Sequence, residues 1–242
     1  MQRILCYNKR VREYFDKSAD DYDIRHSQYN TTFGYIEKMR RECVMWIIGR
    51  RNKNRILDAG CGTGYYLKAL SENDVFGIDI SKGMIWQCRD KNLSNLIIAS
   101  YEFLPFKPGT FDLILCINAF HYTIAPQRVL EEFKNVLKED GEIILTALNL
   151  ISPRGIFHLF KRILFKNKNL ERRYTVFSLW EIFNKVKLKV DDITGFNFIL
   201  TRSDLKRRNE KVLEVFEYIE RKVRRTPIKY LCNEFVIKLR KR

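Results

Sequence analysis

The sequence predicts an α/β fold whose strands are mostly parallel and are joined by helical crossovers. Short apolar segments alternate with amphipathic helical patterns at the intervals typical of strand–helix–strand units. A glycine-rich turn follows the first of the expected strands, as it does in nucleotide-binding sheets. The chain has 242 residues, of which 45% are hydrophobic. This is enough for one large core, so we expect a single domain.

The expected elements follow this alternation along the chain. Two helical patterns occupy residues 9–15 and 33–49, before the first strand. Strands are expected at residues 55–59, 74–80, 96–99, 111–117 and 141–148. Helices are expected between them at residues 64–71, 82–90 and 126–138. After an interruption, a helix at 178–187, a strand at 189–200, a helix at 209–224 and a strand at 234–239 complete an inventory of seven strands.

The most specific pattern is the segment RILDAGCGTGYYLKAL, residues 55–70. Gly60, Gly62 and Gly64 occupy alternate positions, so the backbone can turn tightly and approach a ligand closely. Dinucleotide-binding proteins instead use G-x-G-x-x-G, with a helix N-terminus directed at a pyrophosphate. Asp58 precedes the glycines, and its carboxylate would repel a pyrophosphate but suits an ammonium group. The ligand that combines a nucleoside with an amino acid is S-adenosylmethionine.

Three further segments follow in order after LDAGCGTG. FGIDIS ends the second strand at Asp79, EFLPFKPGTFDLILC leads into the fourth, and VLEEFKNVLKEDGEIILTALN spans the next helix and the fifth strand. Together they resemble the class I S-adenosylmethionine-dependent methyltransferases, in the small-molecule branch that includes the ubiquinone and menaquinone biosynthesis enzymes. The resemblance implies a Rossmann-like seven-stranded sheet with helices on both faces. It also implies that the last strand, within NEFVIKLRKR, is antiparallel beside the fifth.

The same resemblance implies S-adenosylmethionine as cofactor and methyl transfer as activity. It divides the domain into an N-terminal helical cap (residues 1–50), a cofactor-binding core (51–150), a basic lid region (151–187), and the last strands and helix (188–242). Asp58 is expected to neutralise the methionine ammonium. The backbones of Gly60 and Gly62 are expected to contact the methionine portion, whereas Gly64 is expected to serve packing.

Asp79 ends the second strand, where a carboxylate can accept hydrogen bonds from both ribose hydroxyls. A helix-capping role fits Asp79 less well, because Ile80 intervenes before the expected N-cap residue Ser81. Ile80 is expected to pack on the adenine ring or, equally well, in the core. Asp79 is therefore the predicted ribose ligand.

The adenine end departs from the family pattern. Many relatives have an Asp two residues before the Glu that precedes LPF, and here that position is Ser100, in ASYEFLPF. A serine hydroxyl still accepts a hydrogen bond, but a neutral contact is weaker than a charge-assisted one. The backbone of Tyr101 is expected to contact the adenine ring, and Glu102 is the alternative side-chain contact.

The sequence indicates fewer residues for the site of the methyl acceptor. Asn118, His121 and Tyr122 follow the fourth strand, at the edge where open α/β sheets bind ligands, and Asn118 is expected to contact the cofactor. His121 is the candidate general base, although positioning alone can supply much of the acceleration of an in-line methyl transfer. Tyr22 lies in a segment that in relatives folds over the cofactor, and it is expected either to close the site or to lie on a mobile arm.

The net charge of +16 is concentrated after residue 150. The segment GIFHLFKRILF places its apolar side chains on one broad helical face, with Lys161 and Arg162 off that face. This pattern is typical of a basic amphipathic helix on an anionic membrane. The interpretation we favour is a lid whose apolar face covers the substrate pocket, and this suits a lipid-like or aromatic acceptor. Both interpretations are compatible.

Two other classes of function stay open beside a small-molecule methyltransferase. A nucleic-acid methyltransferase, acting on RNA or tRNA, could use the basic surface for phosphate contacts, but CINAFHYT stands where a flipped-base motif would lie. A non-catalytic cofactor-binding protein is the other alternative. The six cysteines and three histidines are dispersed, so we expect no metal site and no disulfide framework. Scattered cysteines and the absence of a signal-peptide pattern predict a cytoplasmic protein.

Overall fold

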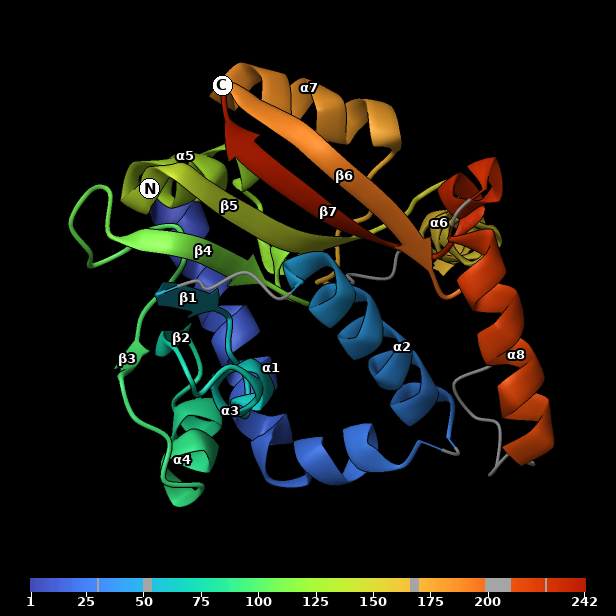
Figure 1. Ribbon diagram of the computed structural model, residues 1–242, viewed down its shortest axis with the longest axis horizontal. Coiled ribbons are helices and arrows are strands. Elements are labelled where there is room, and N and C mark those ends of the chain that lie inside the picture. The colour runs from blue at the N-terminus through green and yellow to red at the C-terminus, as the bar shows by residue number, and fades with distance from the viewer. Residues whose placement is uncertain (30, 50–53, 166–169, 199–209, 225) are drawn as a thin grey trace.

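The computed structural model describes residues 1–29, 31–49, 54–165, 170–198, 210–224 and 226–242. Within them, one sheet has seven strands in the order β3-β2-β1-β4-β5-β7-β6 (Figure 1). The strands are β1 (Arg55–Ala59), β2 (Asp74–Asp79), β3 (Leu96–Ile98), β4 (Phe111–Cys116), β5 (Leu137–Leu148), β6 (Leu188–Phe196) and β7 (Glu234–Lys241). β7 is inserted antiparallel between β5 and β6, which confirms the predicted fold class.

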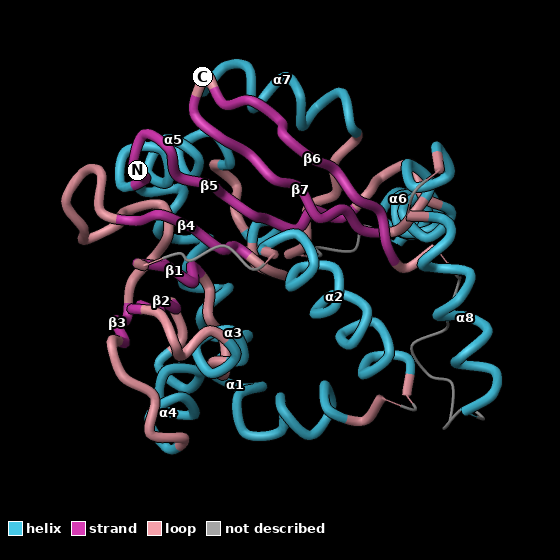
Figure 2. Tube along the Cα trace, in the orientation of Figure 1, coloured by secondary structure: helices cyan, strands magenta, loops and turns pink. Residues whose placement is uncertain are grey.

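Helices flank this sheet on both sides, as Figure 2 shows. The α-helices are α1 (Gln2–Ser27), α2 (Thr32–Ile48), α3 (Tyr65–Ala69), α4 (Lys82–Asp90), α5 (Pro126–Val136), α6 (Pro153–Phe165), α7 (Val176–Val186) and α8 (Glu210–Val223). Two short 3-10 helices, η1 (Phe120–Tyr122) and η2 (Pro227–Leu231), precede α5 and β7. No helix among the described residues has the length and apolar content needed to cross a membrane.

Several element bounds differ from the prediction. The first helix spans 26 residues rather than 9–15, because only a narrow stripe of its surface is buried and its periodicity is weak in the sequence. β5 begins at Leu137, earlier than expected. α3 begins only at Tyr65, because Gly64 has a left-handed φ of 86° that a helical residue cannot adopt. The predicted ends at residues 199–200 and 209 lie outside the described residues.

The core consists of two apolar layers, one on each face of the sheet. Successive side chains of a strand point to opposite faces, so Ile114 and Cys116 of β4 belong to one layer and Leu113 and Leu115 to the other. The first layer is closed by α5 and α7, and the second by α2, α3 and α4. The core leaves the carboxyl ends of β1, β2 and β4 free to form a site.

α1 lies across these carboxyl ends, where it is held by polar contacts. Asn8 Nδ2 donates to Ser100 Oγ (3.1 Å), which follows β3. Asp16 Oδ1 accepts from Ser81 Oγ (2.6 Å), which follows β2. Asp23 Oδ1 accepts from Thr63 Oγ1 (2.5 Å), which follows β1. α1 therefore covers the site rather than the core.

Candidate functional site

The glycine-rich turn after β1 forms the base of the site. Gly60 and Cys61 donate their backbone N–H groups to the carbonyl oxygen of Ile78, at 2.8 and 2.9 Å, and this fixes the turn against β2. Gly62 has a φ of 53°, and a Cβ there would meet nothing within 4 Å, so its backbone faces open space. A Cβ at Gly64 would lie 2.4 Å from the Leu93 side chain, in agreement with the packing role expected for Gly64.

Asp79 lies beside this turn at the end of β2. Its Oδ2 accepts from Gly62 N–H and its Oδ1 accepts from Ser81 N–H, both at 2.9 Å. Burial raises the pKa of Asp79 from 3.8 to about 6, against the lowering effect of these two hydrogen bonds. Each carboxylate oxygen has a second acceptor site, so Asp79 can still receive two hydroxyl donors. Ser81 is the N-cap of α4, as predicted.

Asp58 is the unsatisfied carboxylate of the site. It is 1% exposed, and neither of its oxygens has a hydrogen-bond partner among the described residues. Burial, and then the charge of Asp79, raise its pKa from 3.8 to about 8. A buried carboxylate without partners is costly unless a cation compensates it. Asp58 is therefore a natural counter-ion for a ligand with a positive charge.

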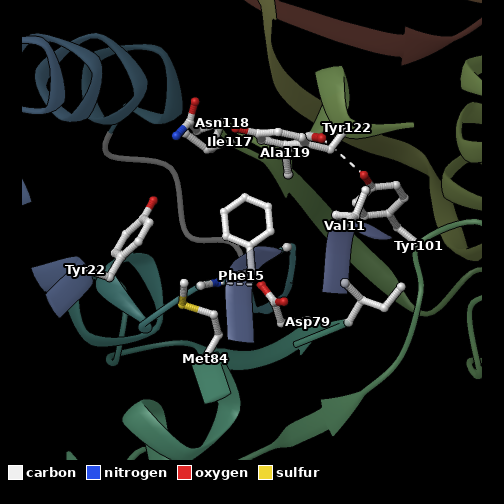
Figure 3. Close-up of a pocket in the computed structure, with 13 residues that line it drawn as sticks. Val11, Phe15, Tyr22, Asp79, Met84, Tyr101, Ile117, Asn118, Ala119 and Tyr122 are labelled. Carbon is white, nitrogen blue, oxygen red and sulfur yellow. Dashed lines mark hydrogen bonds between the residues drawn. The ribbon is translucent and has the colours of Figure 1, made fainter. Parts of the chain in front are cut away.

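A cavity of about 60 Å³, the donor cavity, lies over the turn. It is lined by Val11, Phe15, Tyr22, Gly60, Gly62, Asp79, Ile80, Met84, Tyr101, Ile117, Asn118, Ala119 and Tyr122. Figure 3 shows the ring of Phe15 projecting from α1 into the space bounded by Asp79, Met84 and Asn118. Pockets for drug-sized ligands have volumes of roughly 300 Å³ or more, so a nucleoside-sized ligand needs α1 or its aromatic side chains to move.

The predicted adenine contacts lie in two different places. Tyr101 lines the donor cavity, and its hydroxyl donates to the Ala119 carbonyl at 3.1 Å (Figure 3). Ser100 and Glu102 do not line it. Ser100 Oγ donates to Glu102 Oε2, Asn8 Nδ2 donates to the same oxygen at 3.1 Å, and Thr123 Oγ1 donates to Glu102 Oε1 at 2.6 Å. Glu102 therefore holds α1 and the segment after β4 together.

Asn118 forms the boundary between the donor cavity and a second space. It follows β4 with a φ of 56°, in the left-handed region that few residues other than Gly adopt, and such conformations cluster at functional sites. Its backbone N–H donates to Thr146 Oγ1 at 2.7 Å. Tyr22 lies at the same boundary and stacks on His26, with ring centroids 3.9 Å apart. Burial raises the pKa of Tyr22 well above its usual range.

The second space, the acceptor cavity, has a volume of about 360 Å³ and shares Phe15, Tyr22, Asn118 and Tyr122 with the donor cavity. It is bounded by α1, α2, α6, residues 171–173 and the ends of β5 and β7. All three histidines of the chain, His26, His121 and His158, line it although they are far apart in the sequence. No group of His, Cys, Asp or Glu among the described residues could hold a metal ion.

A buried ion-pair network forms one wall of the acceptor cavity. Arg40 of α2 is 5% exposed and pairs with Glu37 and with Glu234 of β7, the latter at 2.9 Å. Arg41 also pairs with Glu37, at 3.1 Å. These two carboxylates raise the pKa of the Arg40 guanidinium, against the effect of burial. The network ties α2 to the end of β7, and its two arginines, Arg40 and Arg41, balance the charges of the two carboxylates.

His121 lies in η1 and also lines the acceptor cavity. It is 2% exposed, and its Nδ1 has no hydrogen-bond partner among the described residues. Burial, and then the positive charges of Arg40 and Arg173, lower its pKa from 6.5 to about 3. The imidazole is therefore neutral at physiological pH and can exchange a hydrogen bond with a bound molecule.

Several lining residues were not singled out from the sequence. Val11 and Phe15 lie on one face of α1 together with Tyr22, at spacings of four and seven residues, so a helical period over the whole of α1 would have found them. No such signal exists for Arg154 and His158 in the acceptor cavity, because their place depends on how α6 docks.

The position of α6 differs from the favoured lid interpretation. Its apolar side chains do not cover the acceptor cavity; their exposed fractions run from 41% at Leu159 to 72% at Phe165. The α6 residues that line the cavity are Arg154 and His158. All six cysteines are free; Cys6 is exposed and the other five are buried.

Comparisons with known proteins agree with this site. A family model described as a methyltransferase domain matches residues 57–145, which include the glycine-rich turn and Asp79. An uncharacterised protein of Methanocaldococcus jannaschii is 30% identical over 211 residues, covering 85% of this chain and 78% of its own length. The chain belongs to the class I S-adenosylmethionine-dependent methyltransferases. S-adenosylmethionine is its methyl donor.

Two further comparisons extend the match. A malonyl-[acyl-carrier protein] O-methyltransferase of Legionella pneumophila is 27% identical over 157 residues, which is 60% of this chain and 51% of that enzyme. The solved structure of an S-adenosylmethionine-dependent methyltransferase from Thermotoga maritima has a TM-score of 0.63 and 17% identity. It covers 94% of this methyltransferase, and 98% of its own chain is matched.

The residues of the donor cavity suit S-adenosylmethionine. Asp79 lines the cavity and keeps acceptor sites for two ribose hydroxyls. Asp58 is not among the lining residues, but its unpartnered carboxylate just before the glycine-rich turn would suit the methionine ammonium. The open space beside Gly62 admits a ligand against the backbone. The apolar side chains of Ile80 and Met84 line the same cavity and are suited to an aromatic ring.

Proposed function

We propose that this methyltransferase transfers the methyl group to a small molecule bound in the acceptor cavity. The observation that carries the proposal is that the two cavities are neighbours: they share the lining residues Phe15, Tyr22, Asn118 and Tyr122. A volume of about 360 Å³ fits a small acceptor. Methyl transfer is an in-line displacement, so an acceptor held at this boundary gains from proximity and orientation alone.

In this proposal, the cofactor residues keep the roles expected of them. Asp58 neutralises the ammonium group, the backbones of Gly60 and Gly62 contact the methionine portion, and Asp79 accepts the ribose hydroxyls. Ile80 and Tyr101 pack at the adenine end. The cluster of Ser100 and Glu102 supports that end from outside the cavity, because its hydrogen bonds are to Asn8 and Thr123.

His121 is the proposed proton acceptor for the nucleophile. His121 lines the acceptor cavity, and its buried Nδ1 has no partner among the described residues. Burial and the nearby arginines make it a weak base, and a negative charge on the bound acceptor would raise its pKa toward the range in which a general base is effective. A His121→Asn variant should lower kcat by about 100-fold or more while leaving cofactor affinity unchanged. An unchanged kcat would show that positioning alone supports the reaction.

Calorimetric titration with S-adenosylmethionine tests the proposal first. The wild-type protein should bind the cofactor, and Asp79→Ala should lose binding by about 100-fold, because two charge-assisted hydrogen bonds are removed. Glu72, an acidic residue in the loop before β2, provides the control variant Glu72→Ala, which should bind normally. Turnover is then measured on small molecules and on RNA. Salt-dependent RNA binding with methylation of RNA would replace the small-molecule proposal by the nucleic-acid one.

We also infer that α6 binds anionic membranes peripherally. Its apolar side chains are exposed over most of the helix, and Lys161 and Arg162 lie among them. Such helices insert their apolar side chains at the lipid interface while their cations remain near the headgroups. The double variant Phe160→Ser with Ile163→Ser should lose sedimentation with phosphatidylserine vesicles. Phe177→Ser removes an even more exposed aromatic side chain from α7 and should leave the sedimentation unchanged. Equal loss in both variants would contradict the inference.

A further inference from the structure

Two arginines of the acceptor cavity have no carboxylate partner among the described residues. Arg154, at the start of α6, makes neither a hydrogen bond nor an ion pair with the described part of the chain. Arg173 donates through Nη1 to Asn233 Oδ1 at 3.1 Å and to the Asn149 carbonyl at 3.4 Å, which are both neutral acceptors. Arg40, which lines the same cavity, is in contrast paired with two carboxylates.

The carboxylates that line the cavity compensate these two charges only in part: burial lowers the pKa of Arg173, and Glu171 and Glu234 oppose this from a distance, without an ion pair to Arg173 among the described residues. Glu37 and Glu234 are engaged by Arg40. Glu171 accepts a hydrogen bond from the Tyr122 hydroxyl at 3.4 Å, and it forms no ion pair with Arg173. The side of the cavity that α6 and residues 171–173 form therefore carries excess positive charge.

The helix dipole adds to this excess. α6 has 13 residues and no acidic residue in its first turn, where Arg154 lies. A cation at a helix N-terminus is unfavourable by about 0.3–1 kcal/mol, because the partial charge there is also positive. The same end of a helix binds anions well. Arg154 is thus placed where it opposes helix stability but favours a bound anion.

The pKa values of two histidines are lowered by the same positive charges. Burial and then the charges of Arg173, Arg154 and Lys161 lower the pKa of His158 to about 4. His121, which is buried with an unpartnered Nδ1, also faces the positive charge of Arg173. Both imidazoles are neutral, so the positive charge on this side of the cavity comes from the arginines and not from the histidines. His121 offers that anion's molecule a polar contact deeper in the cavity.

We propose that the methyl acceptor is a small organic anion whose carboxylate or phosphate group is bound by Arg154 and Arg173. This inference rests on the proposed function and adds the chemical class of the acceptor. Guanidinium groups bind planar carboxylates and phosphates through paired hydrogen bonds, and partial burial strengthens them. The anionic group anchors one end of the acceptor at α6, which leaves the other end at the boundary formed by Tyr22 and Asn118.

The test is calorimetry on protein saturated with S-adenosylhomocysteine, with benzoate, phenyl phosphate and neutral benzamide as probes of similar shape. At least one of the two anions should bind tenfold or more tightly than benzamide, and the better one shows whether carboxylate or phosphate is preferred. Arg154→Met should weaken that anion tenfold or more. Since Arg154 has no partner in the described structure, this variant is expected to fold, and a thermal melt checks it.

Matched controls remove the same charge nearby. The control variants are Lys161→Met and Arg172→Met. Lys161 is on the same helix as Arg154 and Arg172 is adjacent to Arg173, but neither residue lines the acceptor cavity. Both should keep the affinity for the anion within about threefold. The proposal is overturned if benzamide binds as well as both anions, if neither anion binds, or if the control variants lose as much as Arg154→Met. A protein that does not bind S-adenosylhomocysteine would contradict the proposed function instead.

Discussion

The donor and acceptor cavities lie next to each other and are built in opposite ways. The donor cavity has a volume of about 60 Å³ and lies over the glycine-rich turn, where Asp79 lines it and the nearby Asp58 does not; the pKa values of both carboxylates are raised. The acceptor cavity is about six times larger, draws its residues from widely separated segments and is rich in cations. Among the described residues, the donor side therefore has carboxylates that no cation of the protein neutralises, and the acceptor side has arginines that no ion pair neutralises. Each deficit indicates the charge of the ligand that completes it.

Breaking the ion-pair network of the acceptor side should have the largest effect on stability. Arg40→Met leaves the carboxylates of Glu37 and Glu234 buried without their main partner, and this should lower the free energy of unfolding by roughly 3–5 kcal/mol. Urea denaturation measures the loss. Cofactor affinity of the remaining folded protein should change little, because Arg40 does not line the donor cavity.

A triple variant provides the control. Arg40→Met combined with Glu37→Gln and Glu234→Gln removes the uncompensated charges and should recover more than half of the lost stability. A loss below about 1 kcal/mol for Arg40→Met alone would show that the network contributes little to stability.

On the donor side, Asp58→Asn should raise the stability of the protein at pH 8 while it weakens cofactor binding. Because the folded pKa of Asp58 is raised to about 8, the folded protein keeps a proton that the unfolded chain releases at lower pH. Stability contributed by this group is therefore present at low pH and is lost as the pH rises toward 8. At pH 8 the variant should be more stable than the wild type by on the order of 3 kcal/mol. Thermal or urea unfolding at pH 5 and pH 8 checks this.

The same variant should bind S-adenosylmethionine on the order of 10- to 100-fold more weakly, because a charge-assisted contact is lost. Wild-type affinity should rise by up to about tenfold per pH unit from pH 6 to pH 8, as Asp58 ionises. Titration across this range gives both results. If the variant kept the wild-type pH dependence, Asp58 would not be the group that pairs with the ammonium.

Gly83→Ala should give the smallest effect, by loosening α1. A Cβ at Gly83 would lie 2.9 Å from the Cβ of Ala19, so α1 must move away from α4. Overpacking by one methyl group should weaken the packing of α1 against α4 by about 1 kcal/mol. Hydrogen exchange in α1 should then be roughly fivefold faster. Cofactor association should also become faster, because α1 covers the donor cavity. Ala19→Gly in the same protein should reverse both changes, and its failure to do so would contradict this account.

Most of the residues that the sequence predicts for the donor side are close neighbours in the chain. Asp58, Gly60 and Gly62 lie within five positions, and Asp79 follows at the end of the next strand, so local spacing carried the geometry. The antiparallel insertion of β7 came from the resemblance and not from periodicity, because alternation alone does not give strand order. Ser100 and Glu102 show the limit of this approach, since both lie in the expected segment but are turned toward Asn8 rather than into the cavity.

By itself, the sequence determined the sheet, the glycine-rich turn and the class of cofactor, because strand period and turn chemistry are local properties. Only the tertiary structure brought together His26, His121 and His158, left Arg154 without a partner and exposed the apolar side chains of α6. These features depend on how α1, α2 and α6 dock on the sheet. Docking is decided by packing and charge compensation between segments that are distant in the chain, and no local pattern records it.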